Sequence, residues 1–193
     1  MFILNQQAVT VHLRELSLGD RHAVADLHAD PEVEAGLGFS SNASASEAEA
    51  LITALLHACA AGSARWWAVT RVHDASFIGT CGIHRWSRSW NRCEISFAIC
   101  RAHRGKGYAT AAVQQLINWV DDSTAINRIE ACVRIDNISS ERVLLRLGFK
   151  LEGIQRDGMH FDSAYIDLKQ YSLLRREFSK TSSLPPTPID QEH

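Results

Sequence analysis

The spacing of apolar residues predicts two long helices in this chain. One set of apolar positions comprises Leu51, Ala54, Leu55 and Ala58. The other comprises Val113, Leu116, Ile117 and Val120. Within each set the residues recur every three to four positions, so they fall on one face of a helix, as in a helix that packs against a core.

Local signals predict where the helices begin and end. Two overlapping capping boxes, Ser44-x-x-Glu47 and Ser46-x-x-Glu49, predict the start of the first long helix, and Gly62 predicts its end. A shorter helix is predicted at 20–29, capped by Asp20 and broken by Asp30-Pro31. Another is predicted at 139–147 and stopped by Gly148, while 36–42 is predicted to be a loop.

Strands are predicted between these helices. They lie at 9–16, 65–71, 76–83, 92–99, 128–133, from 149 onward and at 165–174, and the three between 65 and 99 resemble an antiparallel meander. The order β-α-α-β-β-β-α-β-α-β-β predicts one mixed α/β domain over residues 1–178. Residues 179–193, rich in Ser, Thr and Pro, predict a disordered tail.

Composition narrows the class of protein. An apolar content of 46% and a charged content of 22% are ordinary for a soluble globular protein, and a formal net charge of −2 gives no basic field for nucleic acid. The five cysteines are widely spaced with no CxxC pair, which favours reduced thiols. Without a signal-peptide pattern or an apolar run of about 20 residues, we expect a cytoplasmic protein that does not span a membrane.

The turn that follows the strand at 92–99 carries the most chemical information. Arg104, Gly105, Lys106 and Gly107 place cations and free backbone N–H groups at the start of a helix. This arrangement suits an anion such as a pyrophosphate. A Cβ at either glycine would hold the phosphate off the backbone or forbid a positive φ. The alternative is an ordinary glycine-rich turn with two solvated cations.

Two common phosphate-binding motifs do not fit this turn. A Walker loop needs Ser or Thr after Gly-Lys, where this chain has Gly107, and an initial Gly where it has Cys100. The dinucleotide motif G-x-G-x-x-G needs a glycine at Thr110. What remains is Arg104-x-x-Gly107-x-Ala109 between a strand and a helix.

This remaining pattern resembles the acetyl-CoA loop of the GNAT N-acetyltransferases. A second segment, Asn137-x-x-Ser140 followed by Gly148-Phe149 and Glu152-Gly153, is similar to the ribosomal-protein branch of that family, the RimJ/RimL type. The order of elements also matches, so the resemblance runs from about residue 10 to 174. It implies the GNAT fold, an α/β (mixed α+β) architecture with a central, mostly antiparallel twisted sheet of about seven strands flanked by about four helices.

The resemblance implies acetyl-CoA as co-substrate and no metal. The pyrophosphate would bind the loop made by Arg104, Gly105, Lys106, Gly107, Tyr108 and Ala109. The pantetheine arm would lie along the main chain of Phe97, Ala98 and Ile99, where a backbone N–H would polarise the acetyl carbonyl. Asn137 would hydrogen-bond the pantetheine amides, with capping of the following helix as its alternative use.

The resemblance also implies catalytic residues, and here this chain departs from the family. Ser140 matches the proposed general acid for the departing thiolate, with helix capping as the alternative. The position of the family's basic Glu is Met159, which puts the exact substrate in doubt. Glu94, whose pKa partial burial would raise, and His160, which titrates near neutrality, are the candidate bases. Each has a structural alternative, Glu94 as a partner of Arg92 and His160 as a surface residue, and a water relay without a dedicated base is also open.

The expected reaction is direct transfer of an acetyl group from acetyl-CoA to an amine. The favoured acceptor is a protein N-terminal α-amine, with ribosomal proteins as the family precedent. A small-molecule amine (polyamine, amino acid or aminoglycoside) and a catalytically idle acetyl-CoA-binding regulator are the alternatives. The sequence leaves a homodimer open.

Two further features carry less information. The nine histidines lack metal-ligand spacing, and Cys100-x-x-His103 is isolated, so no metal site is expected. The segment 85–92 interleaves Arg and Trp. It predicts a hairpin anchored by its aromatic side chains, with a wall of the acceptor cleft as the functional alternative.

Overall fold

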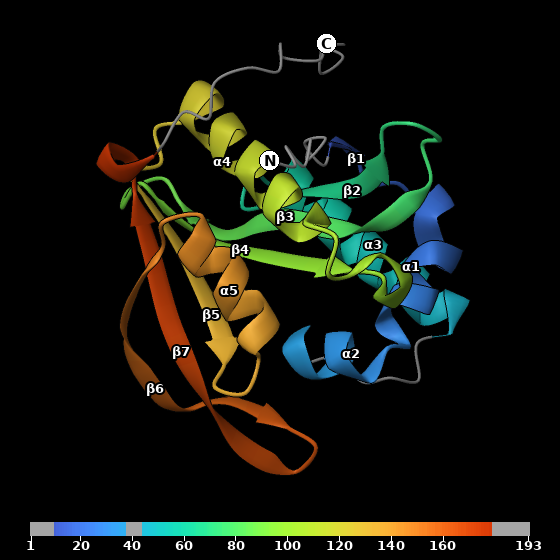
Figure 1. The fold of residues 1–193 in the computed structure, drawn as a ribbon. Helices are drawn as coiled ribbons and strands as arrows, with labels where there is room; N and C mark the ends of the chain where they lie inside the picture. The colour runs from blue at the N-terminus through green and yellow to red at the C-terminus, as the bar shows by residue number, and fades with distance from the viewer. Residues whose placement is uncertain (1–9, 38–43, 179–193) are drawn as a thin grey trace, which may run out of the picture.

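The computed structural model describes residues 10–37 and 44–178, and the strands in this part form one seven-stranded sheet (Figure 1). They are β1 (Val11–Glu15), β2 (Arg65–Arg71), β3 (Phe77–Ser87), β4 (Arg92–Ile99), β5 (Arg128–Arg134), β6 (Lys150–Phe161) and β7 (Ala164–Leu174). The spatial order is β1-β2-β3-β4-β5-β7-β6. Every neighbouring pair is antiparallel except β4 and β5. The predicted fold class, a mostly antiparallel mixed sheet, is confirmed.

Helices cover both faces of this sheet. They are α1 (Arg21–His28), α2 (Pro31–Leu37), α3 (Ala45–Ala60), α4 (Tyr108–Ser123) and α5 (Ile138–Arg146), with short 3-10 turns at Leu18–Asp20, Arg101–His103 and Arg175–Glu177. Figure 1 shows α4 and α5 on one face and α1 and α3 on the other. The two long helices predicted from apolar spacing are α3 and α4. The predicted disordered tail at 179–193 lies outside the described residues.

The main core lies between the sheet and the α4 face. Along β5, Ile129, Ala131 and Val133 are buried in this core, and the residues between them point to the other face. From α4 the four predicted core positions are all buried: Val113, Leu116, Ile117 and Val120. Alternating side chains of β5 and the apolar stripe of α4 therefore form one apolar layer, while the other side chains of β5 point to the opposite, more polar face.

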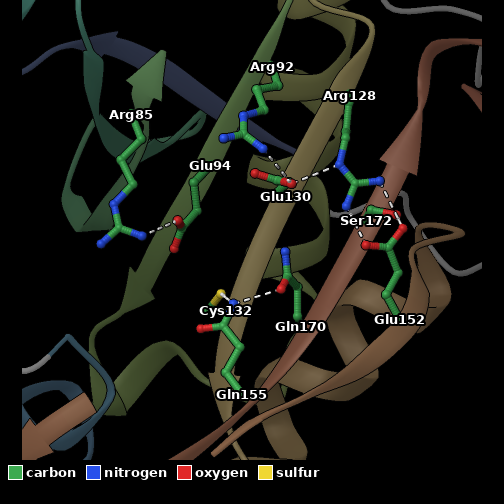
Figure 2. A network of polar contacts seen from close by, with 10 residues as sticks. All are labelled: Arg85, Arg92, Glu94, Arg128, Glu130, Cys132, Glu152, Gln155, Gln170 and Ser172. Atoms are coloured by element: carbon green, nitrogen blue, oxygen red, sulfur yellow. Dashed lines mark hydrogen bonds and ion pairs between the residues drawn. The ribbon is translucent and has the colours of Figure 1, made fainter. Parts of the chain in front are cut away.

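The opposite face is covered only in part. Leu16, Val24 and Ile52 join a second cluster between α1, α3 and the β1–β2 side of the sheet. Leu27, Val33 and Ala98 form a third, which holds α2 against the end of β4. Over β4, β5, β7 and β6 this face instead carries a network of polar side chains (Figure 2).

Capping confirms one predicted helix start and corrects another. Ser44 Oγ accepts from the Glu47 N–H at 3.3 Å, and the Glu47 carboxylate accepts from the Ser44 N–H at 2.7 Å. The predicted capping role of Asp20 is wrong. Its carboxylate instead accepts from the Arg14 guanidinium and from the Ser17 N–H, so it ties β1 to the turn before α1.

The described residues hold five α-helices, where the sequence pattern predicts about four. Asp30-Pro31 does end α1, but Pro31 is also the first residue of α2. Asp30 Oδ1 accepts from the Glu32 N–H at 2.9 Å, which satisfies one free donor at the start of α2. The same two residues therefore stop one helix and begin the next.

Arg175 secures the C-terminal end of α4. Its guanidinium donates to the main-chain carbonyls of Val120, Asp121, Thr124 and Ile126, at 2.8–3.1 Å, and to the Asp121 carboxylate at 2.7 Å. The last carbonyls of a helix have no partner within the helix. One side chain at the end of β7 thus satisfies two carbonyls of the last turn and two just beyond it, and so holds α4 against the sheet.

Candidate active site

A cavity of about 770 Å³ opens beside β4 and β5. The loop 104–107, named the phosphate loop after its predicted ligand, the start of α4, the start of α5 and part of α2 complete its walls. Of the residues predicted to form the site, it is lined by Phe97, Ala98, Ile99, Arg104, Gly105, Gly107, Tyr108, Ala109, Asn137 and Ser140. Segments predicted separately as a donor-binding loop and a catalytic turn thus share one cavity.

The cavity exists because β4 and β5 separate. Their parallel ladder has only three pairs, and Glu94 opposite Glu130 is the last of them. Beyond that point the two strands diverge (Figure 1), and the cavity is lined by residues 95–99 of β4 and 131–134 of β5. The β4 edge here lacks a neighbouring strand among the described residues, so its backbone groups are open to an extended ligand.

The phosphate loop has the backbone geometry expected from its glycines. Gly105 has φ +73°, and Gly107, the residue before the first turn of α4, has φ +87°. Left-handed angles of this kind are readily adopted only by glycine. The first N–H groups of α4 have no intrahelical partner, and Gly107, Tyr108 and Ala109 line the cavity. This end of the cavity is therefore suited to an anion.

The two cations of the loop have structural partners. Arg104 donates through Nε to the Ile99 carbonyl at 2.9 Å, and its other nitrogens lie 2.8 Å from the Glu32 carboxylate and 3.0 Å from that of Asp30. Arg104 therefore links the loop to α2 while lining the cavity. Lys106 Nζ donates to the Ala102 carbonyl at 2.9 Å, and Lys106 is not among the described residues that line the cavity.

Two other arginines on the cavity wall have no ion pair among the described residues. Arg142 and Arg146 lie four residues apart on α5, both exposed. Side chains at this spacing lie side by side on a helix. No sequence motif points to these two arginines, although both follow Ser140 within two turns of the same helix.

The start of α5 is organised by Asn137. Its Oδ1 accepts from the Ser140 N–H at 3.0 Å and from the Ser139 hydroxyl at 2.9 Å, so Asn137 is the helix cap. The predicted capping alternative is thereby confirmed for Asn137, which still lines the cavity. Ser140 is part-buried on the cavity wall, and among the described residues its hydroxyl has no hydrogen-bond partner. That hydroxyl is therefore available to a ligand.

Glu94 lies just outside the cavity lining, on the polar face of the sheet (Figure 2). Its carboxylate pairs with Arg85, whose Nη1 lies 2.9 Å from Oε2, and not with Arg92 as the structural alternative expected. Arg92 instead faces Glu130 at 3.9 Å. Arg85 reaches Glu94 from a bulge in β3, where its φ is +48°. Bulges of this kind redirect a side chain, so that neighbours in sequence share a face.

The remaining carboxylates of this face are also paired. Arg128 binds both Glu130 and Glu152, and the Ser172 hydroxyl donates to Glu152 at 2.6 Å (Figure 2). These contacts lower the pKa of Glu152 to about 2. Cys132 of β5 lines the cavity next to this network, and burial raises the pKa of its thiol to about 11. This face is thus polar, but its glutamates and arginines neutralise one another's charge.

His160 and Met159 lie elsewhere. Both belong to β6, outside the described residues that line the cavity, and the His160 ring packs against Tyr165 with centroids 5.0 Å apart. The segment 85–92 is likewise away from the lining. Trp86 packs edge-on against Trp119 of α4, and Arg88 lies over its ring. This geometry matches the hairpin anchored by aromatic side chains.

The described residues form neither a metal-ligand cluster nor a membrane-spanning helix. In that part of the chain, no three His, Cys, Asp or Glu side chains gather closely enough to hold a metal ion. Nor is any of its helices both long and apolar enough to cross a membrane.

Comparison with known proteins decides the family. The profile of the acetyltransferase (GNAT) domain matches residues 10–150. The chain belongs to the GNAT acetyltransferase family. Among GNAT relatives, the uncharacterized N-acetyltransferase p20 of Bacillus licheniformis is 33% identical over 167 residues, covering 86% of this chain and 94% of that protein. The ribosomal-protein-serine acetyltransferase of Escherichia coli is 32% identical over 99 residues, covering 51% of this chain and 55% of that protein.

Solved GNAT structures share this fold. RimJ of Mycobacterium smegmatis, solved in complex with CoA-disulfide, superposes with a TM-score of 0.80 at 23% identity, covering 86% of this chain and 83% of that one. The spermidine N-acetyltransferase of Vibrio cholerae, solved with CoA and spermine, gives 0.77 at 20% identity, covering 87% and 97%. The GNAT chain is an N-acetyltransferase, and its relatives include the ribosomal-protein branch that its second motif resembles.

Proposed function

We propose that this N-acetyltransferase uses acetyl-CoA as donor and a protein N-terminal α-amine as acceptor. One observation carries the donor assignment. The phosphate loop, the unpaired edge of β4 and the start of α5 line a single cavity of about 770 Å³. Its shape and chemistry suit a long, flexible ligand with an anionic end, and solved neighbours of this fold carry CoA.

Each part of acetyl-CoA has a counterpart on the cavity wall. The pyrophosphate binds the amides of Gly105–Ala109 at the N-terminus of α4. The pantetheine arm lies along residues 97–99 of β4 and occupies the position of a missing strand. A backbone N–H of this edge polarises the acetyl carbonyl, and Asn137 adds hydrogen bonds at the start of α5.

The 3′-phosphate of acetyl-CoA is assigned to Arg142 and Arg146. The other cavity arginines, Arg104 and Arg134, are held by carboxylates, so this pair has the least compensated charge on the lining. The double substitution Arg142→Gln with Arg146→Gln is expected to weaken CoA binding about 30-fold, because two lost charge-assisted contacts of about 1 kcal/mol each at an exposed site together cost about 2 kcal/mol.

The matched ligand control is 3′-dephospho-CoA, measured by calorimetry. The double variant and the wild type should bind it equally, since it lacks the group that the arginines contact. An equal loss for both ligands would assign the arginines to some other part of the cavity. The pair Arg156→Gln and Arg176→Gln, on exposed positions elsewhere, controls for net charge.

Ser140 is proposed to protonate the departing CoA thiolate. Its unpaired, part-buried hydroxyl on the cavity wall supports this role. Ser140→Ala should lower kcat about 100-fold, a typical contribution of a general acid, while CoA affinity stays within about twofold. Ser139→Ala, one residue away, is the control for disturbance of the α5 cap. Equal kcat for Ser140→Ala and wild type would remove Ser140 from the mechanism.

The charge on the open sheet face favours an α-amine over a polyamine. Glu94, Glu130 and Glu152 are each already paired with an arginine. A polyamine carries several ammonium groups and needs unpaired carboxylates. A peptide N-terminus brings one amine, whose pKa of about 7.7–8.0 leaves part of it neutral at physiological pH.

The proposed function is tested by following CoA thiol release with acetyl-CoA and a panel of acceptors. The panel comprises peptides with different N-terminal residues, the same peptides with blocked N-termini, spermidine, free amino acids and an aminoglycoside. Turnover of free but not blocked peptides is expected. Turnover of small amines alone would replace the acceptor assignment, and tight CoA binding without any turnover would favour the regulator. The candidate bases Glu94 and His160 and a cytoplasmic location remain predictions.

A further inference from the structure

A serine and a histidine meet where the cavity reaches the polar face of the sheet. Ser96 Oγ of β4 and His84 Nε2 of β3 lie 2.9 Å apart. Ser96 lines the cavity immediately beyond the last paired residues of β4 and β5, and the half-buried His84 stands behind it. The proposed acetyl group must lie near this point, because the unpaired edge of β4 begins here.

The surroundings fix the His84 ring and set its charge. The Trp66 ring stacks on it at 6.2 Å between centroids with an interplanar angle of 9°. Glu94 is the cross-strand partner of His84, Arg85 pairs with Glu94, and Cys132 of β5 lies on the other side of Glu94. Burial lowers the pKa of His84, the Glu94 charge opposes this, and Arg85 adds to it. The ring is therefore neutral at pH 7 and is able to accept a proton.

We propose that Ser96 and His84 form a proton relay that deprotonates the acceptor amine in the cavity. The Ser96 hydroxyl contacts the amine. It takes a proton from the amine as it gives its own proton to His84 Nε2, and Glu94 stabilises the imidazolium that forms. His84 acts through Ser96 and is a positioning and proton-holding residue. This inference rests on the proposed function and supplies the base that Met159 does not.

The proton count closes with one proton released to solvent. The bound ammonium gives one proton through Ser96 to His84, which later loses it to water. The neutral nitrogen then forms the C–N bond to the acetyl carbon. The C–S bond breaks with its electron pair on sulfur, and the thiolate takes a proton from Ser140. The second proton lost by nitrogen restores Ser140, so the products are the amide, CoA thiol and one proton.

A dependence on pH follows from the direction of the pKa shift. His84 accepts a proton only while it is neutral, so kcat should fall as the pH drops through its pKa. Because that pKa is lowered, this loss should occur below the usual range of histidine. The charged and titratable groups that face the ring from neighbouring strands, Glu94, Arg85 and Cys132, are retained in the variants used for the test.

The test compares His84→Gln, Ser96→Ala and the double variant, with the best acceptor found in the panel. We expect each single variant to lower kcat about 100-fold with CoA affinity unchanged, and the double variant to be no slower than the slower single one, since both residues act in one path. In His84→Gln the acidic loss of kcat assigned to His84 should disappear. His57→Gln, on the exposed side of α3, is the matched control.

Three results would overturn the relay. The first is a kcat of His84→Gln within twofold of that of His57→Gln. The second is strictly multiplicative losses in the double variant. The third is an acetyl group on Ser96, detected by intact-protein mass after incubation with acetyl-CoA and no amine, because it would make Ser96 a nucleophile. If the wild type itself transfers to no amine, the proposed function fails, which is a distinct outcome.

Discussion

Gly107→Glu is expected to abolish measurable binding of acetyl-CoA. Gly107 has φ +87° directly before α4, and it lines the anionic end of the cavity. A glutamate there is strained by about 1–2 kcal/mol and places a carboxylate against the pyrophosphate, a like-charge contact that costs several kcal/mol. The affinity should fall by at least about 100-fold, which corresponds to about 2.7 kcal/mol. Isothermal titration calorimetry with acetyl-CoA measures it.

Two variants separate the causes of that loss. Gly153→Glu makes the same chemical change on β6, where an added Cβ meets no atom within 4 Å, and should bind acetyl-CoA normally. Gly107→Ala carries the strain without the charge and should lose less affinity than Gly107→Glu. Unchanged affinity in Gly107→Glu, with a normal thermal unfolding curve, would show that the anion binds elsewhere.

Arg175→Met is expected to give the largest loss of stability among surface substitutions. The variant keeps the aliphatic stem but removes the guanidinium donors that contact four carbonyls at and just beyond the end of α4. Those carbonyls lie at a part-buried junction, so losing charged donors there should lower the free energy of unfolding by about 2–4 kcal/mol. Urea denaturation followed by circular dichroism measures it.

Arg176→Met is the matched control, because Arg176 is the exposed neighbour in the same 3-10 turn. Its effect should stay within about 0.5 kcal/mol, as for most surface substitutions. Equal losses in the two variants would mean that the charge of this turn matters and that the capping contacts do not.

The parts of the fold that follow from local patterns could be predicted from the sequence. Helical spacing located α3 and α4, and a capping box located the start of α3 at Ser44, because these signals act within a few residues. The helix α2 was missed for a local reason as well. Asp30-Pro31 predicts a helix break, although Asp before Pro also fits a helix start.

Features that depend on strand register could not be predicted. The bulge that brings Arg85 to Glu94 places a non-glycine residue at positive φ, and the ion pair that stabilises it spans two strands. The contact between Ser96 and His84 is diagonal across the same two strands, so it depends on a register that only the folded sheet defines. The sequence predicts that Arg104 contacts the donor, but its partner Glu32 belongs to α2, a helix that the sequence pattern does not predict.

The short pairing of β4 with β5 gives the donor a part in the architecture. With three residue pairs between them, the β1–β4 and β5–β7–β6 halves of the sheet are joined mainly at one end. Under the proposed function, the pantetheine chain closes the other end by hydrogen-bonding to the free edge of β4. In each catalytic cycle the donor would then extend the sheet when it binds, and CoA would leave the gap open again when it dissociates. The co-substrate thus takes the place of an eighth strand.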